Sequence, residues 1–228
     1  MKIDILTLFP EAFSPLKTSI LARAEENGLL EINIINIRDF SQDKHKKCDD
    51  YPFGGGAGML MTVQPLFDAI KSVYDDGAKI IFPSPIGKTY NVQKAQQLSQ
   101  FQHLIFVCGH YEGVDDRLFQ LFDIEQISIG DYVLTGGEIP SMVIIDSLAR
   151  FVDGVITKES LDRESFSNGC LEYPQYTRPQ EFMGLKVPDV LVSGNHQEVD
   201  KWRREQSLLR TKEIRKDLYD KLNNTQDN

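Results

Sequence analysis

The sequence predicts an α/β protein with a mostly parallel sheet. Short runs of apolar and β-branched residues recur through the first two thirds of the chain, and a helical pattern or a loop follows each of them. Five runs are predicted to be buried strands: KIDILTLF from Lys2, LLEINIINI from Leu29, AKIIFP from Ala78, LIFVCG from Leu104 and IEQISIG from Ile124.

Three helical segments accompany these strands and have recognisable ends. SILARAEENG closes on Gly28, in the position where glycine commonly follows a helix. NVQKAQQLSQF opens on Asn91, a good N-cap, and EIPSMVIIDSLARF carries Pro140 near its first turn. Strands that alternate with such helices favour a parallel sheet covered by helices.

The pattern changes twice along the chain and predicts three parts. Residues 1–156 form the α/β domain, and 157–180 are polar, interrupted by proline and without a clear period, which is typical of an interdomain linker. Residues 181–228 contain NHQEVDKWRREQSLLRTKEIRKDLYDKL, a helical pattern preceded by the capping stretch SGNH from Ser193. We therefore expect a small helical C-terminal domain.

Composition and charge exclude several classes of protein. A net charge of -9 over 228 residues argues against a general nucleic-acid binder, because such binding relies on Lys and Arg. The stretch 201–216 is the exception, with seven basic residues and two acidic ones, and it is suited to face phosphates. No membrane span or signal peptide is predicted, so we expect a cytoplasmic protein.

The cysteines predict neither disulfides nor a zinc site. Cys48, Cys108 and Cys170 are odd in number and widely spaced, which suits a reducing compartment. There is no CxxC motif, and a close pair such as His45 with Cys48 is too few ligands for a zinc site. We expect these thiols to pack in the protein, and no metal ligands are assigned.

Two glycine patterns fail as phosphate loops. FPSPIGKT ends like a P-loop, but Phe82 stands where the first glycine belongs. GGGAGM from Gly54 begins like GxGxxG, but Met59 replaces the last glycine. The second stretch is better explained as a mobile loop that approaches a ligand or partner closely.

The junctions between strands and loops are more informative, because open α/β sheets bind ligands beyond the carboxyl ends of their strands. Three junctions follow in order: FPSP from Phe82, VCGHYEG from Val107 and SIGDYVLTGGE from Ser128. They contain no lysine or arginine, but offer glycines, rings, backbone groups and the carboxylates of Glu112, Asp131 and Glu138. A phosphate ligand would be repelled, whereas S-adenosylmethionine combines an adenine, a ribose and a positive centre and fits this lining.

Several long motifs also carry a resemblance to a known family. CGHYEGVDDR, SIGDYVLTGGEIPSMVIIDSLARF, FGGGAGMLM, YTRPQEFMGLKVPDVLVSGNH and KWRREQSLLRT closely resemble the bacterial tRNA (guanine-N1)-methyltransferases of the TrmD type. The resemblance runs from LTLFPEAF to about Lys212. It implies a SPOUT methyltransferase whose α/β domain is tied in a trefoil knot and works as a homodimer. It further implies methyl transfer from S-adenosylmethionine to N1 of guanosine 37 of tRNA, beside the anticodon.

The resemblance also assigns the cofactor residues. Glu112 in HYEG is expected to hold the cofactor or the target base. The other residues expected around the cofactor are Pro85, Gly109, Tyr111, Ser128, Ile129, Gly130, Asp131, Tyr132, Val133, Leu134, Gly136, Gly137 and Pro140. Asp131 is placed beside the sulfonium, while His110 is expected to orient its loop. Mg²⁺ is left open as a further cofactor.

The proposed chemistry needs a base and a cation. N1 of guanine carries a proton at neutral pH, so its alkylation needs a general base and a positive group near O6. By position in the family pattern the cation is Arg150 in LARF, and the base is Glu164 in RESF. The family commonly has aspartate there, so Asp162, two residues earlier, is a rival base.

Access to N1 requires an unstacked base, which loops provide better than sheets. We expect the glycine-rich loop at Gly55 and Gly56 to cover that base. Trp202 either stacks on RNA or anchors its own helix. The basic residues Arg203, Arg204 and Arg210 are expected to contact the anticodon stem-loop.

Two other classes of protein stay open on the residues alone. The acidic net charge and the unusual Glu164 are compatible with an adenosine-ligand sensor or an RNA-binding module without chemistry. A Rossmann-type oxidoreductase would need the GxGxxG motif that is missing. Methyl transfer to tRNA distinguishes all three.

Overall fold

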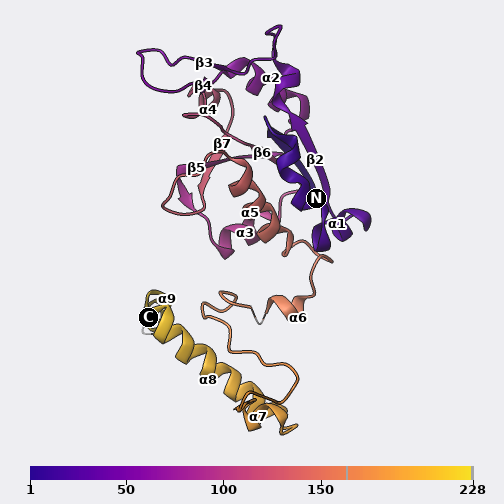
Figure 1. Cartoon of the computed structure of the whole chain (residues 1–228), viewed down its shortest axis with the longest axis vertical. Coiled ribbons are helices and arrows are strands. Elements are labelled where there is room, and N and C mark those ends of the chain that lie inside the picture. Colours follow the sequence, from indigo (N-terminus) through magenta and orange to yellow (C-terminus); the bar gives the residue numbers. More distant parts are fainter. Residues whose placement is uncertain (163, 227–228) are drawn as a thin grey trace. The chain divides into compact units, whose positions relative to one another are not determined.

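The computed structural model describes residues 1–162 and 164–226, which divide into two compact units (Figure 1). The first unit is Met1–Ile156, and the second begins at Thr157. Arg163 of the expected linker and Asp227 and Asn228 of the expected C-terminal domain lie outside the described residues.

A five-stranded sheet forms the centre of the first unit. Its strand order is β2-β1-β6-β5-β7, and every pair is parallel. The strands are β1 (Lys2–Thr7), β2 (Glu31–Asn36), β5 (Lys79–Thr89), β6 (His103–Val107) and β7 (Ile124–Ser128). The predicted α/β class, the parallel sheet and all five strands are confirmed.

The three predicted helices are present with the expected ends. Helix α1 (Ser19–Glu26) is followed by Gly28 at φ +70°. Helix α3 (Val92–Leu98) is capped by Asn91, whose side chain accepts a 2.9 Å hydrogen bond from the Lys94 N–H. Helix α5 (Glu138–Ala149) has Pro140 in its first turn. The unit also contains η1 (Pro10–Lys17), η2 (Ile37–Phe40), α2 (Val63–Val73) and α4 (Leu118–Leu121).

Both faces of the sheet are buried. Successive side chains of a strand point to opposite faces, so Phe106 of β6 lies in one apolar cluster and Val107 in the other. The cluster that includes Phe106 also takes residues of α1, α3, α5 and η1, and the other takes residues of α2, α4 and η2. A sheet covered on both sides explains why its strands are continuous apolar runs.

Two irregular stretches lie beside the sheet. The pairing of β5 with β7 shifts register between Pro83 and Lys88, so the residues between them bulge out. The glycine-rich loop joins two antiparallel strands, β3 (Asp49–Asp50) and β4 (Leu60–Met61). A short strand therefore does precede this loop, which the sequence pattern did not indicate.

The second unit contains helices and one small hairpin. Its elements are α6 (Lys158–Leu161), β8 (Glu181–Phe182), β9 (Leu185–Lys186), α7 (Asp189–Val192), α8 (His196–Ile214) and α9 (Lys216–Gln226). The side chain of Asn195 caps α8 by accepting from the Glu198 N–H. Among the helices described, none is long and apolar enough to cross a membrane.

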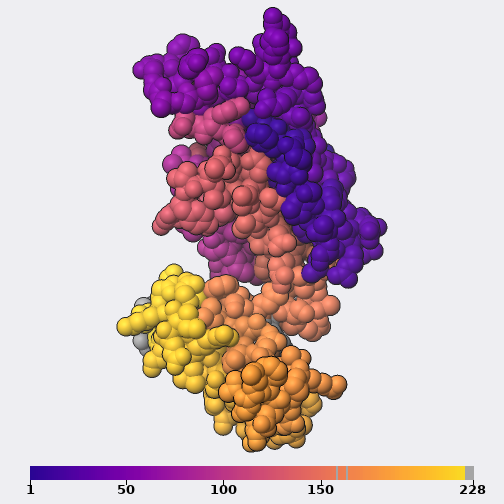
Figure 2. All heavy atoms as spheres, in the orientation of Figure 1, coloured from indigo at the N-terminus to yellow at the C-terminus, as the bar shows by residue number. Residues whose placement is uncertain are grey.

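The segment 157–180, expected as an interdomain linker, folds with the helices that follow it. The Leu171 N–H donates to Thr211 Oγ1 at 2.8 Å, and Ser207 Oγ donates to the Leu171 carbonyl at 2.5 Å. Cys170 beside them is buried. Because Ser207 and Thr211 are four residues apart, they share one face of α8 and bind the same stretch of backbone. The segment lies against α8 in Figure 2, where orange atoms meet yellow ones.

Candidate functional site

A cavity of about 440 Å³ opens at the carboxyl ends of β5, β6 and β7. Three loops and the start of α5 form its walls. Of the cofactor residues predicted from the sequence, the structure brings together Pro85, Gly109, Tyr111, Glu112, Ser128, Ile129, Gly130, Tyr132, Val133, Leu134, Gly136, Gly137 and Pro140.

Glycines let two of these loops touch through their backbones. The Gly137 N–H donates to the Gly109 carbonyl at 2.8 Å. A Cβ on Gly137 would lie 2.8 Å from the Cys108 Cα, and one on Gly109 would lie 2.6 Å from Phe82 Cζ. Both distances are shorter than real Cβ contacts allow, so the approach of main chain to main chain requires glycine at Gly137, whereas at Gly109 the Phe82 ring would have to move.

The lining of the cavity is apolar, with carboxylates at a few places. Its ionisable groups among the described residues are Glu112, Asp116, His110, Tyr111 and Tyr132, with no lysine or arginine. Tyr132, Val133 and Leu134 present exposed apolar surface on the loop after β7. Such walls disfavour a phosphate and suit a ligand that has a flat apolar part and a positive charge.

The loop after β6 is held by ring contacts. The His110 ring lies 4.9 Å from the Phe9 ring and 5.2 Å from the Tyr111 ring, measured between centroids. Tyr111 has φ +60°, and its hydroxyl donates to Asp49 Oδ1 at 3.2 Å. Burial, followed by the neighbouring Asp49 carboxylate, raises the pKa of the Tyr111 phenol, so this hydroxyl remains a donor at neutral pH.

Three groups near the cavity have other positions or roles. Asp131 is exposed and is not among the lining residues, so the structure does not bring it to the cavity. Glu138 is buried and accepts a 2.8 Å hydrogen bond from Thr7 Oγ1, which ties the start of α5 to the end of β1. Cys108 packs 3.3 Å from Ser141 Oγ, and burial raises the pKa of its thiol.

Some residues that line the first cavity were not predicted from the sequence. Asp116 comes shortly after the HYEG motif, and this proximity was the one signal available for it. Phe119 belongs to α4, and its ring contacts the Phe82 ring edge-on at 5.4 Å. Because α4 does not follow a strand directly, no junction pattern pointed to Phe119.

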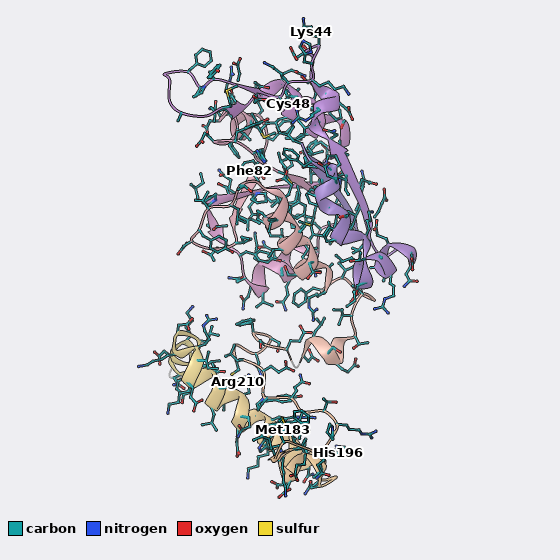
Figure 3. The ribbon with its side chains drawn as sticks, in the orientation of Figure 1. Lys44, Cys48, Phe82, Met183, His196 and Arg210 are labelled. Carbon is teal, nitrogen blue, oxygen red and sulfur yellow. The ribbon has the colours of Figure 1, made fainter. Side chains whose placement is uncertain are left out.

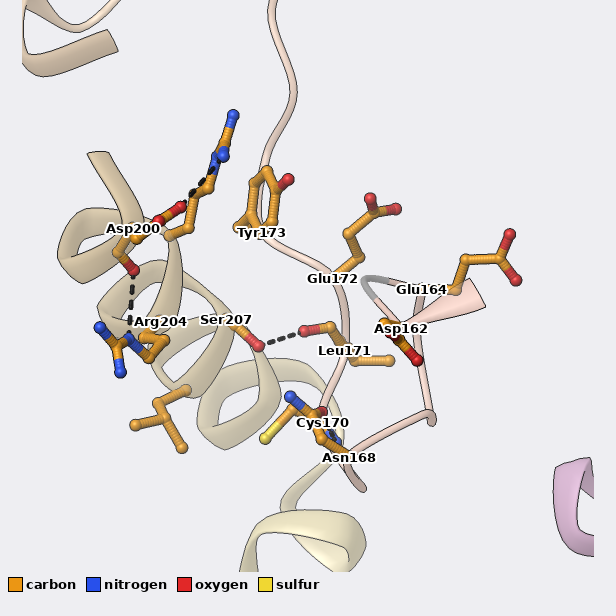
Figure 4. Close-up of a pocket in the computed structure, with 12 residues that line it drawn as sticks. Asp162, Glu164, Asn168, Cys170, Leu171, Glu172, Tyr173, Asp200, Arg204 and Ser207 are labelled. Carbon is orange, nitrogen blue, oxygen red and sulfur yellow. Dashed lines mark hydrogen bonds and ion pairs between the residues drawn. The ribbon is translucent and has the colours of Figure 1, made fainter. Parts of the chain in front are cut away.

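The second unit contains a larger cavity of about 580 Å³ (Figure 4). Unlike the first cavity, it is rich in formal charge. Its lining includes both candidate bases, two further carboxylates and two arginines: Asp162, Glu164, Glu172, Asp200, Arg203 and Arg204. The structure therefore brings Asp162 and Glu164 together with part of the basic helix.

A tight turn presents Glu164. Ser167 Oγ donates to the carbonyls of Asp162 at 3.0 Å and Glu164 at 2.8 Å. The Phe166 N–H donates to the Cys170 carbonyl at 2.7 Å, and Phe166 has φ +76°. Glu164 is half-buried, while Asp162 is exposed. Arg150, the candidate cation, ends helix α5 in the first unit.

The predicted RNA contacts fall in both units. Gly55 and Gly56 lie in the β3–β4 loop of the first unit at φ +80° and +128°. On α8, Arg203 lies 5.1 Å from the centre of the Tyr173 ring, and Arg210 donates to the Glu172 carbonyl at 3.3 Å. Arg204 donates to the Asp200 carbonyl at 3.3 Å.

Trp202 packs within the second unit. Its ring lies 6.4 Å from the ring of Tyr176, in the segment that precedes the hairpin. Of the two roles considered for Trp202, this contact favours anchoring of its own helix.

Comparisons with known proteins identify the family of this chain. The family described as tRNA (Guanine-1)-methyltransferase TrmD matches residues 1–221. A protein of Clostridium perfringens (strain SM101 / Type A) named tRNA (guanine-N(1)-)-methyltransferase is 58% identical to this chain. The matched region covers 97% of this chain and 94% of that protein. The corresponding protein of Clostridioides difficile (strain 630) is 53% identical over 98% of this chain and 99% of its own length. With a match of this extent, the chain belongs to the tRNA (guanine-1)-methyltransferase family, TrmD.

Proposed function

We propose that this protein transfers a methyl group from S-adenosylmethionine to N1 of guanosine 37 of tRNA, beside the anticodon. The observation that carries the proposal is the cavity at the carboxyl ends of β5, β6 and β7, with its apolar walls, backbone groups and carboxylates and no Lys or Arg among its described lining residues. The names of the relatives supply the type of substrate, a guanine of tRNA.

The first cavity fits the methyl donor in shape and charge. Ile129, Tyr132 and Leu134 enclose the adenine, and backbone groups of the glycine loops read its edge. Glu112 is the lining carboxylate best suited to tolerate the sulfonium, since Asp131 lies outside the lining. When bound, S-adenosylmethionine supplies an electrophilic methyl group.

Two side chains prepare the guanine for attack. The Glu164 carboxylate accepts the proton from N1, and the Arg150 guanidinium stabilises negative charge that develops at O6. Glu164 is favoured over Asp162 because it directly precedes the Ser-Phe pair that marks the base position in the family pattern. Glu164 extends one methylene farther than the aspartate that is common in the family.

The second unit is proposed as the helical tRNA-binding domain. Helix α8 carries the basic stretch, and Arg203, Arg204 and Arg210 lie along it. These cations oppose the acidic net charge of the chain and provide contacts for phosphates of the anticodon stem. RNA bound in this way would be held by a local positive surface.

We include a homodimer and a trefoil knot in the proposal. Helix α5 is mostly apolar, and Ile139 and Val143, one turn apart, remain 53% and 45% exposed. Exposed apolar side chains on a mostly apolar helix favour cover by another surface, which a second copy would supply. The backbone contact of the Gly137 and Gly109 loops is the kind of close crossing that a knot needs. The three buried free thiols suit the reducing cytoplasm.

The proposal is tested by transfer of labelled methyl from S-adenosylmethionine to tRNA transcripts that carry G or A at position 37. We expect label in the G37 transcript, recovered as 1-methylguanosine, and background in the A37 transcript. Equal labelling of both transcripts, or donor binding without any transfer, would contradict it and favour a binding module.

A further inference from the structure

Glu138 is a buried carboxylate in the first turn of α5. It is 8% exposed, and Thr7 Oγ1 donates a 2.8 Å hydrogen bond to its Oε1. Among the described residues, no lysine, arginine or histidine forms an ion pair with Glu138, and no group donates a hydrogen bond to its Oε2. A buried charge without a paired cation is costly, and the positive N-terminus of α5 compensates it only in part. A cation that binds nearby would therefore be stabilised by Glu138.

The Oε2 atom of Glu138 lies directly behind the first cavity. Gly136 lines that cavity together with Phe82, which is labelled in Figure 3. A Cβ on Gly136 would collide with Glu138 Oε2 and would lie 2.9 Å from His110 Cδ2. Because Gly136 has no side chain, the carboxylate comes close to the backbone of the lining loop.

The surroundings of Glu138 leave its charge weakly screened. Burial raises the pKa of the neighbouring Cys108 thiol, and the Glu138 charge raises it further, so Cys108 stays neutral. Glu112, by contrast, is exposed, and water screens its charge more than that of a buried carboxylate. Glu138 is therefore suited to distinguish ligands of the first cavity by their charge.

We propose that Glu138 is a specificity-determining residue whose buried charge makes the first cavity favour the positively charged methyl donor over the neutral product. The inference rests on the proposed function and deepens it. Glu138 is not among the lining residues, so it acts through its charge and not through contact with the ligand.

Methyl transfer removes the charge to which Glu138 is attracted. The bond between sulfur and the methyl carbon breaks, and its electron pair stays on sulfur, which becomes a neutral thioether. The methyl carbon bonds N1 of the guanine, whose proton passes to the base Glu164. The attraction to Glu138 is lost in this step, which favours exchange of S-adenosylhomocysteine for a new donor.

The test compares Glu138→Gln with the wild-type chain by calorimetry. The ligands are S-adenosylmethionine, the neutral S-adenosylhomocysteine, and sinefungin, whose amine replaces the sulfonium as the positive group. Glutamine removes the charge but keeps an oxygen that accepts from Thr7. We expect the Kd values of the two positive ligands to rise about tenfold, because one buried charge is lost. The Kd of S-adenosylhomocysteine should stay within about twofold, which also shows that the cavity is formed.

Two further variants separate charge from shape. Glu138→Met, uncharged and similar in length, should give the same pattern as Glu138→Gln. Asp146→Asn is the matched control, because it removes an exposed carboxylate from the same helix, and it should leave all three constants unchanged.

Two outcomes would overturn the inference. One is that all three constants are unchanged in Glu138→Gln. The other is that all three rise equally, which would show that Glu138 only ties α5 to β1. If the wild-type chain methylates G37 while either outcome holds, the inference about Glu138 fails and the proposed function stands.

Discussion

The two cavities of this molecule differ in the residues that line them. The cavity of the first unit is made by loops at the ends of three strands, with glycine backbones in contact and mostly apolar side chains. The cavity of the second unit is lined by four carboxylates and two arginines, on α8 and the segment before it. In the proposed function, the first holds the methyl donor, whereas the second provides the base and arginines that contact the tRNA.

In the proposed function, this difference separates binding of the methyl donor from the acid–base step. A cavity formed by backbone contacts tolerates little change, because a single added methyl group meets another stretch of main chain. A cavity formed by charged side chains tolerates isosteric changes in shape but not in charge. Substitutions that change shape should therefore impair the first unit, and substitutions that change charge should impair the second.

The largest combined effect on donor affinity and stability is expected for Gly137→Ala in the first cavity. The new Cβ would lie 2.8 Å from the Cys108 Cα and the Gly109 nitrogen, so one of the two loops must move. We expect methyl transfer to fall about 100-fold or more, because the donor is misplaced. The free energy of unfolding should fall by about 1–3 kcal/mol in urea titrations.

Gly77→Ala is the matched control for this glycine. The nearest atom to its Cβ would be Asp75 Oδ1 at 3.5 Å, an ordinary contact. If Gly137→Ala and Gly77→Ala both retain wild-type donor affinity, the backbone contact does not define the donor site.

A smaller effect is expected when the cations of α8 are neutralised together as Arg203→Gln, Arg204→Gln and Arg210→Gln. Glutamine keeps a donor for the contacts with Asp200 and the Glu172 carbonyl, so the second unit should stay folded. We expect tRNA affinity to fall roughly tenfold, and its salt dependence to flatten by about 0.7–0.9 log units per lost phosphate contact. Lys71→Gln on α2 serves as the control, and equal salt slopes in all three proteins would remove the RNA role of α8.

The smallest effect concerns the amino ends of the strands, away from the donor cavity. Asp75 Oδ2 lies 2.6 Å from His103 Nδ1, and this hydrogen bond lowers the pKa of Asp75 below its ordinary 3.8. A lowered pKa in the folded state stabilises the fold above pH 3.8, and this stability is lost as pH falls through the folded value.

Asp75→Asn should therefore flatten the loss of stability in acid without changing donor affinity at neutral pH. Urea titrations between neutral pH and pH 3 check the first expectation, and calorimetry checks the second. If the free energy of unfolding of Asp75→Asn falls as steeply in acid as that of the wild-type chain, the His103 contact does not form in solution.

Much of the first unit could be predicted from the sequence, because local patterns decide it. The apolar strand runs, the Asn91 cap and Gly28 each depend on a few neighbouring residues, and all three appear as expected. A cavity lies where the rule on the carboxyl ends of strands and the resemblance predicted a ligand site, and its ligand stays a prediction. Asp131 lies outside the lining, which was not predicted because sequence position does not reveal on which side of a loop a side chain lies; its role beside the sulfonium stays a prediction.

The second unit was harder to predict, because distant contacts form it. The segment 157–180 has no period of its own, and its order comes from Ser207 and Thr211 of α8, more than 30 residues later. Its polar composition resembles that of a free linker, which is how the sequence pattern was interpreted. The packing of Trp202 on Tyr176 and the charged cavity depend on the same long-range docking.

The division between the two cavities is tested most directly by measuring donor affinity and single-turnover methyl transfer on Glu164→Gln. The account predicts a Kd for S-adenosylmethionine within about twofold of the wild-type value, and a transfer rate roughly 10²–10⁴-fold lower, as expected for a lost general base. A near-wild-type rate, with Asp162→Asn inactive instead, would contradict the assignment of Glu164. A donor Kd that weakens in step with the rate would contradict the division itself.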